Sequence, residues 1–169
     1  MKLSLVPDYR FATFDMASAD FLQSIGVKGL ILDVDNTLEP YEHPIPGDHV
    51  VKWLEQLSAV GIRCAIVSNN NKERIDLFNK ELGLVAFAKA KKPFKKNVLK
   101  ALSEIGVEPT EAALIGDQVF TDVWAARNAG IRAILVPPIN DKRDLFTRFK
   151  RILERPIIRK YERKKKKEN

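Results

Sequence analysis

The 169-residue sequence contains one cysteine, Cys64, so no disulfide can form within the chain. A lone thiol suits a reducing compartment, and its apolar neighbours favour core packing over catalysis. No apolar run approaches the roughly 20 residues that span a bilayer, and residues 1–10 lack the apolar stretch of a signal peptide. The two histidines, His43 and His49, show no metal-ligand spacing. These absences predict a cytoplasmic protein whose membrane contact, if any, is peripheral.

The positive charge is concentrated at the C-terminal end. The net charge is +7, and residues 159–169 hold seven basic and two acidic residues, which leaves the rest of the chain at only +2. A run of like charges is usually disordered and solvated, and it can also dock on RNA, a ribosome or an anionic membrane. We therefore expect residues 157–169 to form a basic, disordered tail with one of these possible partners.

Short apolar runs alternate with amphipathic stretches along most of the chain. Near-continuous apolar runs predict strands buried on both faces, as in a parallel sheet. Apolar residues at three- and four-residue spacing predict the intervening helices. The alternation predicts an α/β fold: a doubly wound, Rossmann-like, mostly parallel sheet with helices on both faces. The predicted strands cover residues 29–32, 64–67, 85–88, 112–115 and 131–136.

The length fits one catalytic domain with two flanking segments. We expect residues 1–28 to pack on the core as an extension, with a short helix at 16–25, and residues 29–156 to form the domain. A last helix is expected at about 144–153, ending before Pro156 because proline interrupts a helix.

Polar residues follow four of the predicted strands, where open α/β sheets carry their sites. These residues are Asp33-Val34-Asp35-Asn36-Thr37, Ser68-Asn69-Asn70, Lys91-Lys92-Pro93 and Gly116-Asp117, with Asp122 five residues further on. Each group alone could be a turn, a helix cap or a solvated surface. Their shared placement at four strand exits favours a catalytic site.

The grouping of three aspartates at neighbouring strand ends has a chemical explanation. Asp33 and Asp35 leave one strand together and Asp117 leaves another, so they would repel each other without a cation. Mg²⁺ prefers oxygen ligands, and it neutralises the charge of a phosphate group so that an anionic carboxylate can attack the phosphorus. Asp33 is then the expected nucleophile and Asp35 the acid–base partner. Ser68 can donate a hydrogen bond to a phosphoryl oxygen, and Lys92 can offset its charge.

These motifs resemble those of the haloacid dehalogenase superfamily. Asp-x-Asp-x-Thr matches residues 33–37, a serine at a strand end matches Ser68, the motif lysine matches Lys92, and Gly-Asp-x₄-Asp matches Gly116-Asp117 with Asp122. The resemblance covers residues 29–136. The whole pattern is most similar to subclass IIIA and its YqeG-like phosphatases, to which phosphatidylglycerophosphate phosphatases are related.

The resemblance implies a set of roles for these residues. It implies a phosphoaspartate on Asp33, and Mg²⁺ held by Asp33, the backbone carbonyl of Asp35, and Asp117, with Asp122 supporting this group. Phosphate contacts would come from Thr37, Ser68, Asn69 and Lys92. Because the second aspartate is present, the implied reaction is phosphoryl transfer, with water as the simplest acceptor.

The spacing of the motifs leaves no room for a large cap domain, so the site should be open to bulky substrates. Three classes of function remain open. The first is a phosphatase acting on a soluble or macromolecular phosphomonoester. The second is a lipid phosphatase at the membrane surface. The third is a regulatory protein on RNA or the ribosome that uses the same scaffold.

Overall fold

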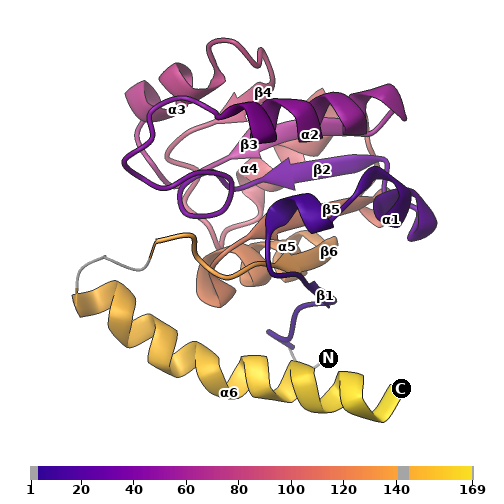
Figure 1. Cartoon of the computed structure of the whole chain (residues 1–169), viewed down its shortest axis with the longest axis vertical. Coiled ribbons are helices and arrows are strands. Elements are labelled where there is room, and N and C mark those ends of the chain that lie inside the picture. The colour runs from indigo at the N-terminus through magenta and orange to yellow at the C-terminus, as the bar shows by residue number, and fades with distance from the viewer. Residues whose placement is uncertain (1–3, 141–144, 169) are drawn as a thin grey trace.

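A six-stranded, entirely parallel sheet forms the centre of the molecule (Figure 1). The computed structural model describes residues 4–140 and 145–168. The strand order is β1-β6-β5-β2-β3-β4. The strands are β1 (Tyr9–Arg10), β2 (Gly29–Leu32), β3 (Arg63–Val67), β4 (Val85–Phe87), β5 (Ala112–Gly116) and β6 (Arg132–Leu135). The predicted doubly wound α/β fold is confirmed.

Helices cover both faces of the sheet. They are α1 (Ala19–Ser24), α2 (Asp48–Ala59), α3 (Lys72–Asn79), α4 (Lys96–Glu104), α5 (Trp124–Ala129) and α6 (Leu145–Glu168), with short turns η1 (Phe14–Met16), η2 (Pro109–Glu111) and η3 (Val119–Val123). Because successive strand residues point to opposite faces, Leu30 and Leu32 pack with α1, α2 and α3, whereas Ile31 packs with α4 and α5. Among the described residues, no helix has the length and apolarity needed to cross a membrane.

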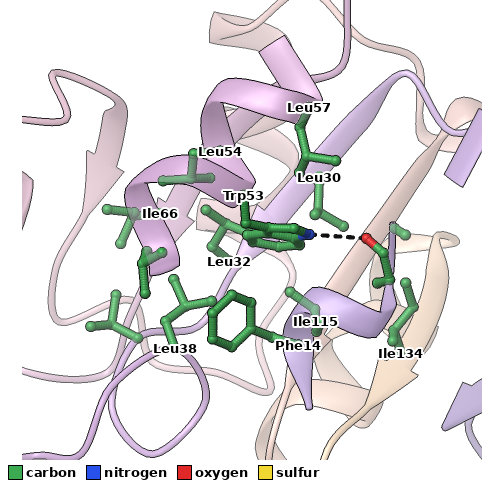
Figure 2. Packing of buried hydrophobic residues seen from close by; sticks show 14 of the residues in the cluster. Phe14, Leu30, Leu32, Leu38, Trp53, Leu54, Leu57, Ile66, Ile115 and Ile134 are labelled. Atoms are coloured by element: carbon green, nitrogen blue, oxygen red, sulfur yellow. Dashed lines mark hydrogen bonds between the residues drawn. The ribbon is translucent and has the colours of Figure 1, made fainter. Parts of the chain in front are cut away.

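The N-terminal segment completes the layer that holds α2. Trp53 of α2 is 3% exposed, and its indole N–H donates to the carbonyl of Ala17 at 3.1 Å (Figure 2). The ring of Phe14 meets the Trp53 ring edge-on, with centroids 4.9 Å apart. β1 then pairs with β6, which the sequence did not predict because two residues are too short to show a pattern. Residues 9–28 therefore belong to both the core and the sheet.

The expected end of the last helix before Pro156 is wrong, and its expected start at residue 144 lies outside the described residues. α6 runs through Pro156 to Glu168, so residues 157–168 are helical rather than disordered. A helix-interior proline costs about 3 kcal/mol, but packing on both sides of it favours the helix. The Glu154 carboxylate accepts from the backbone N–H of Val119 at 2.8 Å, and Ile157 and Ile158 pack against the layer of α4 and α5. Figure 1 shows α6 beside β1.

Candidate active site

The first polar group leaves β2 in a tight turn. Asp33 still belongs to the sheet, since its backbone N–H donates to Ile115 at 3.0 Å. Asn36 then adopts a left-handed conformation, with φ of 62°, which asparagine tolerates better than most residues. The turn brings Thr37 back onto the strand end, where its hydroxyl donates to Asp33 Oδ2 at 2.9 Å. Asp33 and Asp35 are both largely buried.

Lys92 reaches this turn from the segment after β4. Its Nζ lies 2.7 Å from Asp33 Oδ1 and 2.7 Å from Asp122 Oδ1. Burial alone would lower the pKa of Lys92, but the carboxylates of Asp122 and Asp33 raise it above its usual value. The Asn69 side chain holds the Lys92 backbone by two hydrogen bonds, of 2.7 and 3.1 Å. Lys92 is therefore a fixed, charged bridge between two carboxylates.

The second pair of carboxylates comes from the end of β5. Asp117 follows Gly116 directly, and its Oδ1 lies 3.5 Å from the Thr37 hydroxyl. Asp122 lies on η3, and its Oδ2 accepts from the backbone N–H of Gln118 at 3.1 Å. Burial raises the pKa of Asp122 to about 6, although Lys92 acts in the opposite direction. An added Cβ on Gly116 would lie 2.3–2.5 Å from Asp122 atoms, so only glycine leaves room for this side chain.

These carboxylates form one compact cluster. Asp33, Asp117 and Asp122 are buried, and one oxygen from each lies within 4.8 Å of the others. Lys92 lies against two of these carboxylates, those of Asp33 and Asp122. Three hard oxygen donors gathered in one buried place fit a divalent cation such as Mg²⁺.

A sequence comparison assigns the chain to a family. The profile of the haloacid dehalogenase-like hydrolases matches residues 27–136, which include every active-site residue named so far in this subsection. The chain belongs to this family.

Two relatives bear on the activity of this haloacid dehalogenase-like hydrolase. The chain is 34% identical to the probable phosphatase YqeG of Bacillus subtilis (strain 168), over 97% of this chain and 95% of that protein. It is 28% identical to the glyceraldehyde 3-phosphate phosphatase of Pyrococcus abyssi (strain GE5 / Orsay), over 62% of this chain but only 47% of that protein. The expected resemblance to YqeG-like phosphatases is confirmed, and the chain is an enzyme of the phosphatase class in this family.

Solved structures support the fold. The cobalt-bound deoxy-D-mannose-octulosonate 8-phosphate phosphatase from Haemophilus influenzae superposes with a TM-score of 0.54 at 16% identity, covering 81% of this chain and 92% of that one. As in a hydrolase without a large cap, only α2 and β3 follow the Thr37 turn before Ser68, and only α3 and β4 separate Ser68 from Lys92.

The remaining predicted residues lie at the same edge of the sheet. Ser68 is 2% exposed at the end of β3, and its Oγ accepts from the backbone N–H of Asn70 at 3.1 Å. The Asp35 side chain is not part of the cluster of Asp33, Asp117 and Asp122 and has other partners. Its Oδ2 accepts from Asn70 Nδ2 at 2.7 Å, and its Oδ1 lies 3.1 Å from an Arg74 guanidinium nitrogen. The acidic group thus splits into a cluster of three carboxylates and a separately held Asp35.

Sequence reasoning assigned no role to three residues at this edge. Asn70 and Arg74 hold Asp35, and Glu39 is 3% exposed and accepts from the backbone N–H of Gly47 at 2.8 Å. Asn70 had a signal, since it directly follows Ser68 and Asn69 at a strand exit. Arg74 and Glu39 had none beyond charge, and a charged residue in a loop or helix is normally exposed.

Proposed function

We propose that this enzyme is a Mg²⁺-dependent phosphatase that hydrolyses a phosphomonoester through an aspartyl-phosphate on Asp33. The observation that carries the proposal is the setting of Asp33. One of its oxygens is held by Lys92 and the other by Thr37, with the Asp117 carboxylate beside Thr37. A buried carboxylate fixed by a lysine and a hydroxyl has its orientation set before substrate arrives, which favours in-line attack on phosphorus.

The metal site follows from the acidic cluster. Asp33, Asp117 and the backbone carbonyl of Asp35 would hold the ion. Bound there, Mg²⁺ would supply the positive charge that lets a phosphate dianion approach a carboxylate. Asp122 lies in the same cluster, but its two oxygens already face Lys92 and the Gln118 N–H, so its role is to orient the lysine. Lys92 then neutralises charge on Asp33 and on the phosphoryl oxygens.

The reaction has two steps that use Asp33 and Asp35 in turn. First, an Asp33 oxygen forms a bond to phosphorus while the bond to the ester oxygen breaks, and Asp35 in its protonated form gives its proton to that oxygen. Second, water attacks phosphorus and gives a proton to Asp35, the bond to Asp33 breaks, and inorganic phosphate leaves. Ser68, Thr37 and the backbone of Asn69 are the expected partners of the phosphoryl oxygens, together with Lys92.

The covalent step can be tested by a change that keeps the shape of the site. Asp33→Asn should abolish turnover, because an amide oxygen is a poor nucleophile, while urea unfolding stays cooperative. The matched control is Asp76→Asn, whose carboxylate is 58% exposed on α3 and should leave activity unchanged. Acid-quenched enzyme should carry a hydroxylamine-sensitive phosphate in the wild type and not in Asp33→Asn. Full labelling of the variant would contradict the assignment.

The metal can be tested without activity. Mg²⁺ at a hundred times its Kd should stabilise the wild-type protein by about 2.7 kcal/mol, because it binds only the folded state. Asp117→Asn should remove most of this gain in a thermal unfolding experiment, and Asp76→Asn should keep it. An equal gain in Asp117→Asn would place the ion elsewhere.

A lipid phosphatase is the second candidate, favoured by the rim of the site. Tyr41, Ile45, Phe94 and Ile139 are exposed apolar residues on loops at the carboxyl edge of the sheet, between 49% and 69% accessible. The basic residues at the C-terminal end of α6 offer a separate contact for an anionic membrane, on the side opposite the loop that follows β2 (Figure 1). Removing residues 159–169 should weaken pelleting with anionic vesicles. Unchanged pelleting would refute membrane docking.

A regulatory role on RNA or the ribosome is the third alternative. Steeply salt-dependent RNA binding without phosphatase activity would favour it.

A further inference from the structure

Arg74 is a buried cation whose role is not explained by the phosphate site itself. It lies in the first turn of α3, where the N-cap residue Asn71 accepts its backbone N–H at 2.8 Å. Its side chain is only 10% exposed. The guanidinium carbon lies 5.3 Å from the ring centroid of Phe78, which is fully buried. Burying a guanidinium is costly unless it is paired and hydrogen-bonded, so its contacts indicate what it does.

The Arg74 guanidinium contacts two parts of the segment that follows β2. One nitrogen donates to the carbonyl of His43 at 2.8 Å and lies 3.1 Å from Asp35 Oδ1. The other terminal nitrogen donates to the carbonyl of Pro44 at 2.8 Å. Arg74 thus ties both Asp35 and the tip of the loop at residues 40–47 to α3.

Asn70 and Glu39 complete this arrangement. Asn70 holds the second oxygen of Asp35, so each carboxylate oxygen has a partner of its own. Glu39 holds the end of the same loop through Gly47 and its middle through His43 Nδ1, which lies 3.1 Å from its Oε2. The middle of the loop is therefore held by both Arg74 and Glu39, and its end by Glu39. A lysine in place of Arg74 would carry all its N–H donors on one atom, so it would not reproduce the planar fork whose two terminal nitrogens contact the His43 and Pro44 carbonyls and Asp35.

We propose that Arg74 is the positioning residue for Asp35. It holds the carboxyl group that exchanges a proton with the leaving oxygen, and it fixes the adjoining loop at the mouth of the site. This inference rests on the proposed function, because it gives Arg74 a catalytic effect only through Asp35. Loss of Arg74 should therefore impair departure of a leaving group that needs a proton, and spare one that does not.

The test compares two esters in the full-length, Mg²⁺-loaded enzyme. An alkyl phosphate needs a proton on its leaving oxygen, whereas p-nitrophenyl phosphate leaves as a stable anion. In Arg74→Met, the first-turnover rate of leaving-group release should fall about 10- to 100-fold for the alkyl ester, as expected for a misplaced catalytic group, and less than about 3-fold for the nitrophenyl ester. This rate is measured because hydrolysis of the phosphoenzyme, which both esters share and which also uses Asp35, comes after it. Arg74→Lys keeps the charge and should fold even if Arg74→Met does not. It should give the same preference with a smaller loss.

Two comparisons separate positioning from simple structural support. In an Asp35→Asn background, Arg74→Lys or Arg74→Met should cause little further loss of this first-turnover rate for the alkyl ester. Arg127→Met removes another partly buried arginine, paired with Asp8 at 2.9 Å and away from Asp35. It should lower the urea midpoint without changing the ratio of the two first-turnover rates of leaving-group release.

The outcomes distinguish this inference from the proposed function. If Asp35→Asn slows first-turnover leaving-group release equally for both esters, the role of Asp35 as the acid fails, and with it the basis for the inference. If Asp35→Asn is selective for the alkyl ester but the Arg74 variants affect both esters equally, or neither, the proposed function survives and the role of Arg74 is refuted.

Discussion

Replacing Gly116 by alanine should damage the site through a single methyl group. The backbone of Gly116 is not left-handed, so alanine meets no conformational penalty there. Its Cβ, however, would lie 2.3 Å from Cγ, 2.5 Å from Cβ and 2.5 Å from Oδ2 of Asp122. Two of these atoms lie close to the Asp122 backbone and cannot swing away as the end of a long side chain can. Either η3 or the Asp122 side chain must move.

The size of the effect follows from what Asp122 holds. Overpacking of a buried place costs about 1–3 kcal/mol. A displaced Asp122 also loses its 2.7 Å contact with Lys92 and its hydrogen bond from Gln118. We expect Gly116→Ala to lose about 1–3 kcal/mol of unfolding free energy in urea. Its kcat should fall about 10-fold or more, because Lys92 loses one of the two carboxylates that orient it.

The control is Gly61→Ala, in which alanine meets a conformational cost of the backbone but no steric clash. Gly61 has φ of 81° and no atom near an added Cβ, so alanine should cost about 1 kcal/mol and leave kcat unchanged. In addition, Asp122→Ala should cost less in the Gly116→Ala background than in the wild type, because it removes the close contacts with Cγ and Oδ2 and leaves only the one with Cβ. Wild-type kcat and stability in Gly116→Ala, or strictly additive effects, would refute the steric argument.

Two further predictions concern places away from the site. Burial raises the pKa of Cys64 from 9.0 to about 12, so the thiol stays neutral from pH 7 to 10, and folded protein at pH 8 should react with iodoacetamide roughly a thousand times more slowly than unfolded protein. Comparable rates, measured by mass spectrometry, would contradict the burial of this thiol. Glu154→Ala removes the acceptor of the buried Val119 N–H and should cost about 1–3 kcal/mol in urea, whereas Glu154→Gln, which keeps an acceptor, should cost less. Equal losses for these two variants would show that the hydrogen bond to α6 contributes little.

The parallel core could be predicted because its signals are local. β2, β3, β4, β5 and β6 all begin and end within two residues of the predicted strands, since an apolar run buried on both faces is visible in the sequence. The ends of α2 and α4 also have a local signal, because Gly61 and Gly106 directly follow their C-cap residues and adopt the left-handed conformation that glycine allows. The four motif groups could be placed together because parallel strands end at one edge.

The features that sequence did not reveal depend on distant partners. α6 continues past Pro156 because Glu154, Ile157 and Ile158 find contacts on the core, and no pattern around a proline encodes them. The division of the acidic residues was equally hidden. Asp35 follows Asp33 by two residues, but its side chain turns to Asn70 and Arg74 on the neighbouring segment. Spacing indicates which carboxylates are near one another and not which cation each one faces.

The position of β2 has a consequence for local motion. This strand is paired on both sides, by β3 and β5, and all four of its residues are buried. The Asp33 amide extends the pairing with β5 by one more hydrogen bond. Amide protons here should be among the last to exchange with deuterium, since only opening of the whole domain releases them. Local motion of the surrounding loops can then admit substrate and release phosphate. Asp33, which carries the attacking carboxylate, keeps its position throughout, because it continues the strand whose amides exchange most slowly.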